Sequence, residues 1–196
     1  MRVFLSILIL IFSLQSLTYA EDIRDFQIEG MSVGDSLLDY MSIKNINDNV
    51  IKNYFNDGKK RKYYAIVYSK ISKYDQIEIY LETGDRNYEI KTISAFLDIP
   101  KKCKKKKNDI VEDLKVLFKN IQPTSYDDVP HTFDKTGESK TFQTAFLLKN
   151  DNNKDQIRVE CTYWSDAIKK KHQFVNTLGV SVFSTETLQW ALNGYK

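Results

Sequence analysis

The chain has 196 residues, 42% of them hydrophobic, and its 29 Lys and Arg against 26 Asp and Glu give a formal net charge of +3 at pH 7. This length suits one domain or two small subdomains that share a core. The charge is too small to indicate a nucleic-acid-binding protein, and the low content of proline and glycine, 3 and 7 residues, excludes a chain that is mostly disordered linker.

Residues 1–20 have the pattern of a secretory signal peptide. Arg2 provides the positive end, Phe4–Phe12 form an apolar run, and Thr18–Ala20 offer small residues for cleavage. We therefore expect a periplasmic or secreted protein whose mature chain starts near Glu21 and, without Arg2, has a net charge of +2. The apolar run is shorter than the roughly 20 residues that span a bilayer, so we expect no membrane span after cleavage.

The chain contains two cysteines, Cys103 and Cys161. An even number of cysteines in an exported protein favours a disulfide bond between them. The alternative, a reactive thiol, needs an activating base nearby. The sequence predicts the disulfide.

The stretch from Gln27 to Leu38 carries the first helix-start pattern. The Ser32 hydroxyl can accept a hydrogen bond from the Asp35 amide, and the Asp35 carboxylate can reach back to Ser32, so we predict that a helix begins here. Gly30 and Gly34 fit a sharp entry turn. An anion-binding helix N-terminus over residues 30–36 is the functional alternative, and the pattern favours the capped helix.

The rest of the first half predicts a second helix followed by a three-stranded meander. The helix is indicated by apolar residues between Ile43 and Phe55 at helical spacing. Strands are expected at 63–68, 74–81 and 88–98. In the middle strand Ile77, Ile79 and Leu81 alternate with polar or aromatic residues, which is typical of a half-exposed antiparallel strand.

The second half repeats this order. Pro100 is expected in the first turn of a helix with an apolar stripe from Cys103 to Ile121, and the six lysines among residues 101–107 are expected on its other faces. Residues 122–139, with Pro123 and Pro130, are predicted to form a loop. Strands are expected at 142–148, 155–164 and 174–183, and Ser184 or Thr185 is expected to cap a last helix.

The expected fold is therefore α+β, an antiparallel sheet packed against helices. We further expect two tandem helix-plus-three-strand halves, residues 21–99 and 100–196, in one globular unit. The tripeptide Asp-Gln-Ile opens the middle strand of each half, at Asp75 and at Asp155, which supports an internal repeat.

No catalytic or cofactor motif stands out, and we predict no metal site. Asp151, Asn153 and Asp155 have the spacing that starts a calcium-binding loop, but Gln156 replaces the required glycine and Thr162 replaces the bidentate acid. A turn is favoured at this position. His131 and His172 are far apart in the sequence, so we expect each to be a single, solvent-exposed histidine.

Three basic clusters are the candidate binding residues. If they converge, they form a surface for anionic lipid or cell-wall polymer, whereas the alternative is a set of solvated helix and turn ends. Tyr63, Tyr64 and Trp164 are nearby aromatic residues. The clusters are Lys59, Lys60, Arg61 and Lys62; the run from Lys101 to Lys107, of which Lys104, Lys105, Lys106 and Lys107 are the candidate binding residues; and Lys169, Lys170 and Lys171 with His172.

The segment Ile28-Glu29-Gly30-Met31-Ser32-Val33-Gly34-Asp35-Ser36-Leu37-Leu38 resembles the opening of small exported bacterial proteins. It is also distantly similar to the helix entry of the BamE/SmpA family, whose helix-and-meander fold is shared with β-lactamase-inhibitor-like proteins. Members of that family are lipoproteins, but this chain has no cysteine near Ala20 to carry a lipid. The resemblance implies a binding or scaffold module, and no functional residue is carried over from it.

We therefore expect an exported, non-catalytic binding or scaffold protein of the cell envelope that contacts another protein or an envelope component. One alternative is a hydrolase of envelope polymers that uses carboxylates from different strands. The other is a protein that binds anionic membrane or cell wall by charge. No cofactor and no nucleic-acid partner are expected.

Overall fold

The computed structural model describes residues 22–51, 61–71, 73–98, 101–150 and 153–193. Several predicted features lie outside these ranges: the signal peptide, Tyr54 and Phe55, Lys59 and Lys60, Pro100, and Asp151. The described elements are α1 (Ile43–Asp48), β1 (Tyr63–Ile71), β2 (Tyr74–Glu82), β3 (Ile90–Asp98), α2 (Cys103–Leu117), β4 (Thr124–Pro130), β5 (Lys140–Asn150), β6 (Asn153–Tyr163), α3 (Asp166–His172), β7 (Thr177–Phe183) and α4 (Thr185–Leu192).

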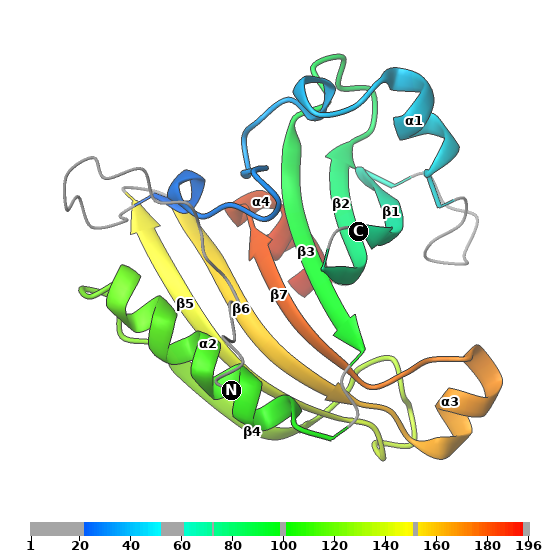
Figure 1. The fold of residues 1–196 in the computed structure, drawn as a ribbon, viewed down its shortest axis with the longest axis vertical. Coiled ribbons are helices and arrows are strands. Elements are labelled where there is room, and N and C mark those ends of the chain that lie inside the picture. The colour runs from blue at the N-terminus through cyan, green and yellow to red at the C-terminus, as the bar shows by residue number, and fades with distance from the viewer. Residues whose placement is uncertain (1–21, 52–60, 72, 99–100, 151–152, 194–196) are drawn as a thin grey trace, which may run out of the picture.

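All described strands join one seven-stranded antiparallel sheet in the order β1-β2-β3-β7-β6-β5-β4 (Figure 1). Two three-stranded meanders, β1 to β3 and β5 to β7, meet where β3 pairs with β7, for example at Ile93 and Val182. β4 adds an edge strand beyond β5. The α+β fold and the first meander were predicted correctly.

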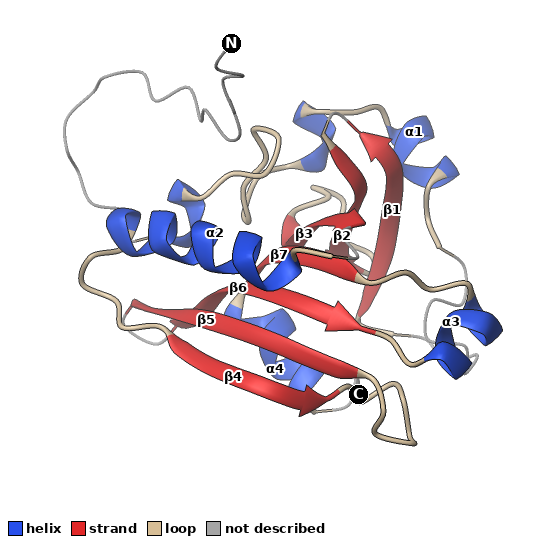
Figure 2. Ribbon diagram, turned by 60° about the horizontal axis from the view of Figure 1, so that its bottom comes forward, coloured by secondary structure: helices blue, strands red, loops and turns tan. Residues whose placement is uncertain are grey.

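Helices cover both faces of the strongly curved sheet. α2 lies on the concave face and α4 on the opposite face (Figure 2). The Ser184 hydroxyl caps α4 by accepting a hydrogen bond from the Thr187 N–H at 3.3 Å, as predicted. Trp190 of α4 is buried against the rings of Tyr63 and Tyr80, with centroid distances of 5.1 and 6.2 Å.

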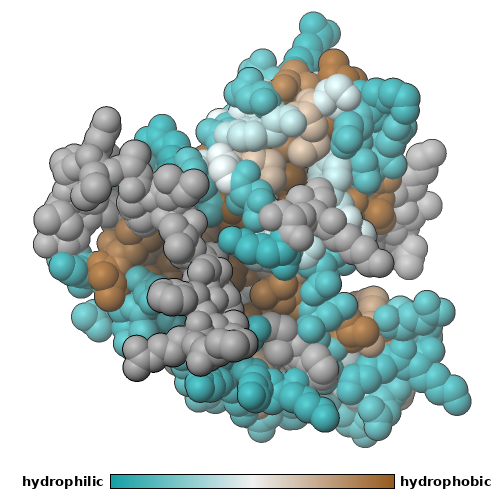
Figure 3. Space-filling model, in the orientation of Figure 1, coloured by the Kyte–Doolittle hydropathy of each residue, from teal (hydrophilic) through white to brown (hydrophobic). Residues whose placement is uncertain are grey.

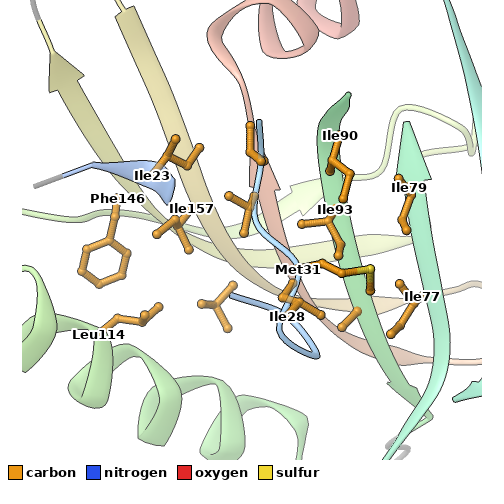
Figure 4. Close-up of a cluster of buried hydrophobic side chains, with 14 of the residues drawn as sticks. Ile23, Ile28, Met31, Ile77, Ile79, Ile90, Ile93, Leu114, Phe146 and Ile157 are labelled. Atoms are coloured by element: carbon orange, nitrogen blue, oxygen red, sulfur yellow. The ribbon is translucent and has the colours of Figure 1, made fainter. Parts of the chain in front are cut away.

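The core lies between the concave face and the segments above it (Figure 4). Ile77, Ile79 and Leu81 of β2 point into it and are fully buried, as their alternation predicted. The N-terminal segment contributes Ile28 and Met31 to the same cluster. Because a buried aliphatic side chain of this size stabilises a fold by about 1.5–3 kcal/mol, the docking of residues 22–37 is a substantial part of the core.

The predicted helix start at Ser32 is wrong. Of the two hydrogen bonds predicted for the cap, only the one from the Ser32 N–H to the Asp35 carboxylate is formed, at 2.8 Å. The Ser32 hydroxyl instead donates to the Arg24 carbonyl at 3.0 Å. Gly30 and Gly34 have φ values of +80° and +96°, a region that glycine adopts at low cost. The chain therefore turns twice in this stretch, and the next helical turn after it is a 3₁₀ turn at Leu37–Asp39, which follows an earlier 3₁₀ turn at Ile23–Asp25.

The second predicted helix is shorter than expected. It ends at Asp48, and Val50 pairs with Ile66 of β1. Hydrogen bonds from the Ile51 N–H to the Ala65 carbonyl and from the Val67 N–H to the Asn49 carbonyl, 3.0 and 3.1 Å, extend the sheet beyond β1. The described apolar residues after Asp48 therefore lie in a segment that pairs with the edge strand β1 and do not continue the helix.

The predicted disulfide between Cys103 and Cys161 is present, with a Cα–Cα distance of 5.9 Å. It joins the first residue of α2 to β6. The prediction that all lysines at the start of α2 avoid the buried face is wrong, because Lys107 is buried. It lies four residues after Cys103 and four before Val111, which places all three on one helical stripe.

Residues 124–130, predicted as loop, form the edge strand β4. Every residue of this strand is exposed, so no apolar alternation marks it. A bulge at Asp127 and Asp128, with φ +57° at Asp128, shifts its register, and Pro130 is tolerated because an edge strand has one unpaired side. α3 was also missed, although the Ser165 hydroxyl caps it by accepting from the Ile168 N–H.

Candidate functional site

The topology brings two of the three predicted basic clusters to one end of the sheet. β3, β4 and β6 finish at this end and β5 and β7 begin there, as the pairs Asp98–Thr177 and Lys140–Tyr163 show. The connections that carry the start of α2, residues 131–139 and α3 therefore lie at the same end (Figure 1). Arg61 and Lys62, the described part of the third cluster, do not join them, because Lys62 precedes Tyr63, which pairs with Glu82 at the opposite end.

An aromatic cluster is centred on this end. We define it as His131, Phe133, Trp164, His172 and Phe174. Ring centroids are 4.3 Å apart for His131 and Trp164, 4.8 Å for Trp164 and Phe174, and 5.1 Å for Phe133 and His172. Aromatic pairs at such separations attract one another beyond their burial alone. The cluster joins the β4–β5 connection to the β6–β7 connection.

The prediction of single, exposed histidines is wrong for His131, and for His172 only the exposure is confirmed, because both rings contact other aromatic side chains. His131 is half-buried against Trp164, and its Nδ1 accepts a hydrogen bond from the Phe133 N–H at 3.2 Å. His172 is exposed but contacts the Phe133 ring. Burial lowers the pKa of His131, and nearby Asp134 opposes this only in part. Burial therefore favours the neutral form of His131.

The buried carboxylate of Asp134 holds the two connections together. It accepts hydrogen bonds from the Ser139 hydroxyl and N–H, 2.6 and 2.9 Å, from the Thr136 hydroxyl, 2.7 Å, and from the Ser165 hydroxyl, 3.0 Å. Ser165 is also the cap of α3. The hydroxyls of Ser139 and Thr136 hold the pKa of Asp134 well below its usual range. This network positions Phe133 and α3 relative to each other.

Exposed apolar side chains and the lysines of α3 both lie at this end of the sheet. Phe133 is 47% exposed and Val175 is 49% exposed, and Lys169, Lys170 and Lys171 follow one another on α3. In the view of Figure 3, hydrophobic atoms border a largely hydrophilic surface near α3. We call the aromatic cluster together with Val175 and Lys169–Lys171 the aromatic–lysine end.

The predicted lysines of α2 have different environments. The Lys104 ammonium lies over the Phe142 ring, 3.4 Å from its centroid, and Lys105 and Lys106 are exposed. Lys107 is buried, and its Nζ donates to the Thr144 hydroxyl at 2.7 Å, which in turn lies 2.9 Å from the Ser125 hydroxyl. Burial lowers the pKa of Lys107. Lys107 is therefore a core residue and not part of a surface for an anion.

The carboxylates at the opposite end of the sheet have fewer features of a functional site than the aromatic–lysine end. Glu82, Asp85 and Glu89 line a shallow pocket of about 360 Å³ with Lys91 at the opposite end of the sheet. The Asp85 carboxylate accepts the N–H groups of Asn87 and Glu89, and Lys91 pairs with Glu89 at 2.8 Å. Within the described ranges, no three His, Cys, Asp or Glu side chains are grouped so as to hold a metal ion.

Sequence reasoning named Trp164 and the lysines of α3 but missed Phe133, Asp134, Phe174 and Val175. The aromatic residues come from two connections about 30 to 40 residues apart, and their contact depends on the antiparallel pairing of β5 and β6. Asp134 followed by Thr136 was a usable signal, because aspartate often accepts the N–H two residues ahead, as it does here at 3.0 Å.

No family model matches the sequence, and no curated protein or solved structure is detectably similar to it. In the part of the chain that the structure describes, no helix has both the length and the apolar character needed to cross a membrane. The function is therefore argued from the site alone.

Proposed function

We propose that this chain is an exported, non-catalytic binding protein that attaches to an anionic component of the cell envelope through its aromatic–lysine end. The observation that carries the proposal is the exposure of Phe133 and Val175 beside three consecutive lysines. Exposed aromatic and cationic side chains in one place are typical of binding surfaces.

Two further features support the proposal. The disulfide between Cys103 and Cys161 is of the kind that persists in oxidising compartments, which agrees with the signal pattern of residues 1–20. The Asp134 network holds the binding residues on a defined scaffold, and a preorganised surface loses less conformational entropy on binding.

The alternative of a carboxylate hydrolase has less support. The pair Asp127 and Asp128 lies in the bulge of the exposed strand β4, and Asp85 and Glu89 already bind backbone N–H groups or Lys91. Two-carboxylate catalysis needs one acid and one base that flank a substrate site. In the described pocket at the opposite end, Asp85 and Glu89 are instead engaged in contacts within the fold.

The test is binding of the purified mature protein to the envelope fraction of its source cells, measured by co-sedimentation at increasing salt. Wild-type protein is expected to bind at low salt and to dissociate as charge is screened. Substitution of Lys169, Lys170 and Lys171 by serine is expected to abolish most of this binding.

The matched control removes three exposed lysines from other places, Lys44, Lys115 and Lys154, and has the same net charge as the first variant. It is expected to bind like wild type. Equal loss of binding in both variants would show a general charge effect, and undiminished binding of the α3 variant would refute the proposed surface.

A further inference from the structure

We infer that the anionic component is the surface of a phospholipid bilayer and that Phe133 and Val175 insert between its headgroups. This inference rests on the proposed function and adds the class of partner and the mode of contact. It is carried by two exposed apolar side chains, Phe133 and Val175, at the same end of the sheet as the lysines of α3. The Phe133 ring contacts the ring of His172, the residue after Lys171, at 5.1 Å.

The first step is the position of the apolar side chains. Phe133 belongs to the β4–β5 connection and Val175 to the β6–β7 connection, so both lie beyond the strand ends and not on a sheet face. Residues at connections between strands can enter an interface without unpairing the sheet. Phe133 also contacts Phe174 at 5.5 Å, which places a second aromatic ring directly behind it.

The second step is the polarity of the ring cluster behind these side chains. Trp164 is half-buried and contacts Phe133 edge-on at 6.0 Å, and the exposed His172 contacts the same ring. Tryptophan and other rings with an apolar body and a polar edge favour the headgroup level of a bilayer. The rings in contact with Phe133 therefore include two, Trp164 and His172, that suit this level of a bilayer.

The third step is charge. Lys170 and Lys171 are exposed, and Lys169 has only a 3.5 Å ion pair with the fully exposed Asp166. Lysine is a flexible point charge whose long stem can lie along apolar surface while the ammonium reaches a phosphate. A cluster of lysines beside an apolar tip provides the two contributions, charge and insertion, that reversible membrane binding requires.

A bilayer fits these observations better than a charged polymer or an acidic protein. A soluble polymer would use the lysines but would leave Phe133 and Val175 in water, and an acidic protein partner would need an extended complementary surface of about 800 Å² on each side. The apolar tip consists of two partly exposed side chains, Phe133 and Val175. Shallow insertion into a fluid interface needs only such a tip.

The experiment measures binding of the oxidised mature protein to vesicles of phosphatidylcholine alone and of phosphatidylcholine with phosphatidylglycerol, by co-sedimentation. Binding is expected only to the anionic vesicles. Replacing Lys169, Lys170 and Lys171 by serine is expected to weaken it by about a hundredfold at low salt, on the basis of about 1 kcal/mol for each lysine.

Insertion is tested separately. Phe133→Ser is expected to weaken binding to the anionic vesicles by roughly tenfold, on the basis of its partial burial in lipid. The matched control is Val116→Ser, which removes a side chain that is 67% exposed on α2 and is expected to leave vesicle binding unchanged. Far-ultraviolet circular dichroism of each variant verifies that it is folded.

Tryptophan fluorescence gives a direct readout of depth. Lipids brominated near the headgroup are expected to quench Trp164, and this quenching is expected to disappear in Trp164→Phe, because Trp190 is buried in the core. Anionic vesicle binding with this quenching supports the inference.

Three outcomes overturn it. Equal binding to neutral and anionic vesicles would contradict the proposed contribution of charge. Binding to anionic vesicles without quenching of Trp164 and without an effect of Phe133→Ser would contradict insertion. Binding to the envelope fraction without binding to any vesicle removes the lipid, leaves the proposed function in place, and points to a polymer or protein. Loss of envelope binding itself would instead refute the proposed function.

Discussion

At the scale of single residues, Asp134 determines how the aromatic–lysine end is built. Its buried carboxylate accepts hydrogen bonds from Ser139, Thr136 and Ser165, which belong to two separate connections. Because these donors stabilise the charged form, the pKa of Asp134 in the folded protein lies below its usual range. Folding and the ionisation of this carboxyl group are therefore linked.

Asp134→Asn is expected to lower the melting temperature at pH 7. A carboxyl group whose folded pKa is depressed stabilises the fold fully above its unfolded pKa, near 3.9, and this stabilisation is lost as the pH falls toward the folded value. The difference in melting temperature between wild type and variant should thus be constant at neutral pH and shrink below about pH 4. The measurement is thermal unfolding followed by circular dichroism from pH 2 to 8.

Asp166→Asn is the control for this experiment, because Asp166 lies in the first turn of α3, directly after Ser165, but is fully exposed. It is expected to change the melting temperature little. If Asp134→Asn behaves like Asp166→Asn at every pH, the carboxylate does not hold the two connections together.

Lys107 differs from Asp134, because its environment disfavours the charged form of the side chain. Its ammonium has one described hydrogen-bond partner, the Thr144 hydroxyl, and burial lowers its pKa. The unfolded state, with a lysine pKa near 10.4, binds more protons between the two values. The free energy of unfolding therefore contains a contribution from Lys107 that rises with pH in that window.

Lys107→Met is expected to raise the free energy of unfolding by about 1 kcal/mol at pH 7, since an apolar side chain of similar length replaces a buried ammonium. The gain should shrink as the pH rises toward 10. Urea unfolding at several pH values measures both, and Lys106→Met, at an exposed neighbouring position, provides the control. A destabilised variant with no dependence on pH would show that the amine is needed for packing.

At the scale of elements, the disulfide determines where α2 begins on the sheet. Cys103 is the first residue of α2, and Lys102 before it provides no side-chain cap. The lysines in this first turn are unfavourable for the helix dipole. The covalent link to Cys161 of β6 therefore holds a helix start that the local sequence stabilises poorly.

Replacing both cysteines by alanine is expected to lower the free energy of unfolding by about 4 kcal/mol, the loop-entropy value for a separation of 58 residues. Reduction of the wild-type protein should give a similar loss. Urea unfolding of the oxidised, reduced and double-variant proteins measures it. A double variant as stable as the oxidised wild type would contradict this role.

Elements were predictable where local sequence and burial agree. β2 follows apolar alternation, β1 follows a run of aromatic and β-branched residues, and α4 follows a serine cap and an apolar stripe. β4 was missed because its residues are all exposed, so nothing selects a period of two. The helix expected at Ser32 was wrong because tertiary contacts of Ile28 and Met31, and the left-handed backbone at Gly34, outweigh a short capping pattern.

The candidate site was predictable only in part for a related reason. Consecutive lysines are visible in a sequence, but their exposure is not. Lys107, for example, lies on the apolar stripe of α2 and is buried. The contacts of Phe133 with Trp164 and His172 depend on which strands pair. Long-range pairing is not encoded in any one segment, so the aromatic cluster could not be predicted from the sequence.

At the scale of the whole molecule, the sheet is two meanders joined between β3 and β7. The two Asp-Gln-Ile tripeptides occupy matching places. Gln76 pairs with Phe96 and the Asp75 carboxylate accepts the Asp98 N–H at 2.8 Å, while Gln156 pairs with Phe183 and the Asp155 carboxylate accepts the Thr185 N–H at 2.7 Å. The internal repeat stays a prediction, and this correspondence supports it.

The two edges of the sheet differ. β1 is extended by residues 49–51, whose backbone pairs with it. β4 forms the other edge, and it carries the bulge at Asp127 and Asp128 and ends at Pro130. Charged residues, bulges and proline at an edge all oppose pairing with a second sheet. β4 therefore combines three features that keep separate molecules from joining edge to edge.

Removing these features together is expected to cause association. Deletion of Asp128 restores a one-to-one register between Tyr126, which pairs with Gln143, and Val129, which pairs with Thr141; Asp127→Thr and Pro130→Thr then remove the charge and supply a backbone N–H. Sedimentation velocity should show assembly of this variant that grows with concentration, beyond any seen for wild type. Thr124→Val adds an apolar β-branched side chain to the same strand but keeps the bulge, charge and proline, and it should not assemble. Equal assembly of both variants would assign the effect to apolar surface, and no assembly of either would show that the bulge, charge and proline are not what protects this edge.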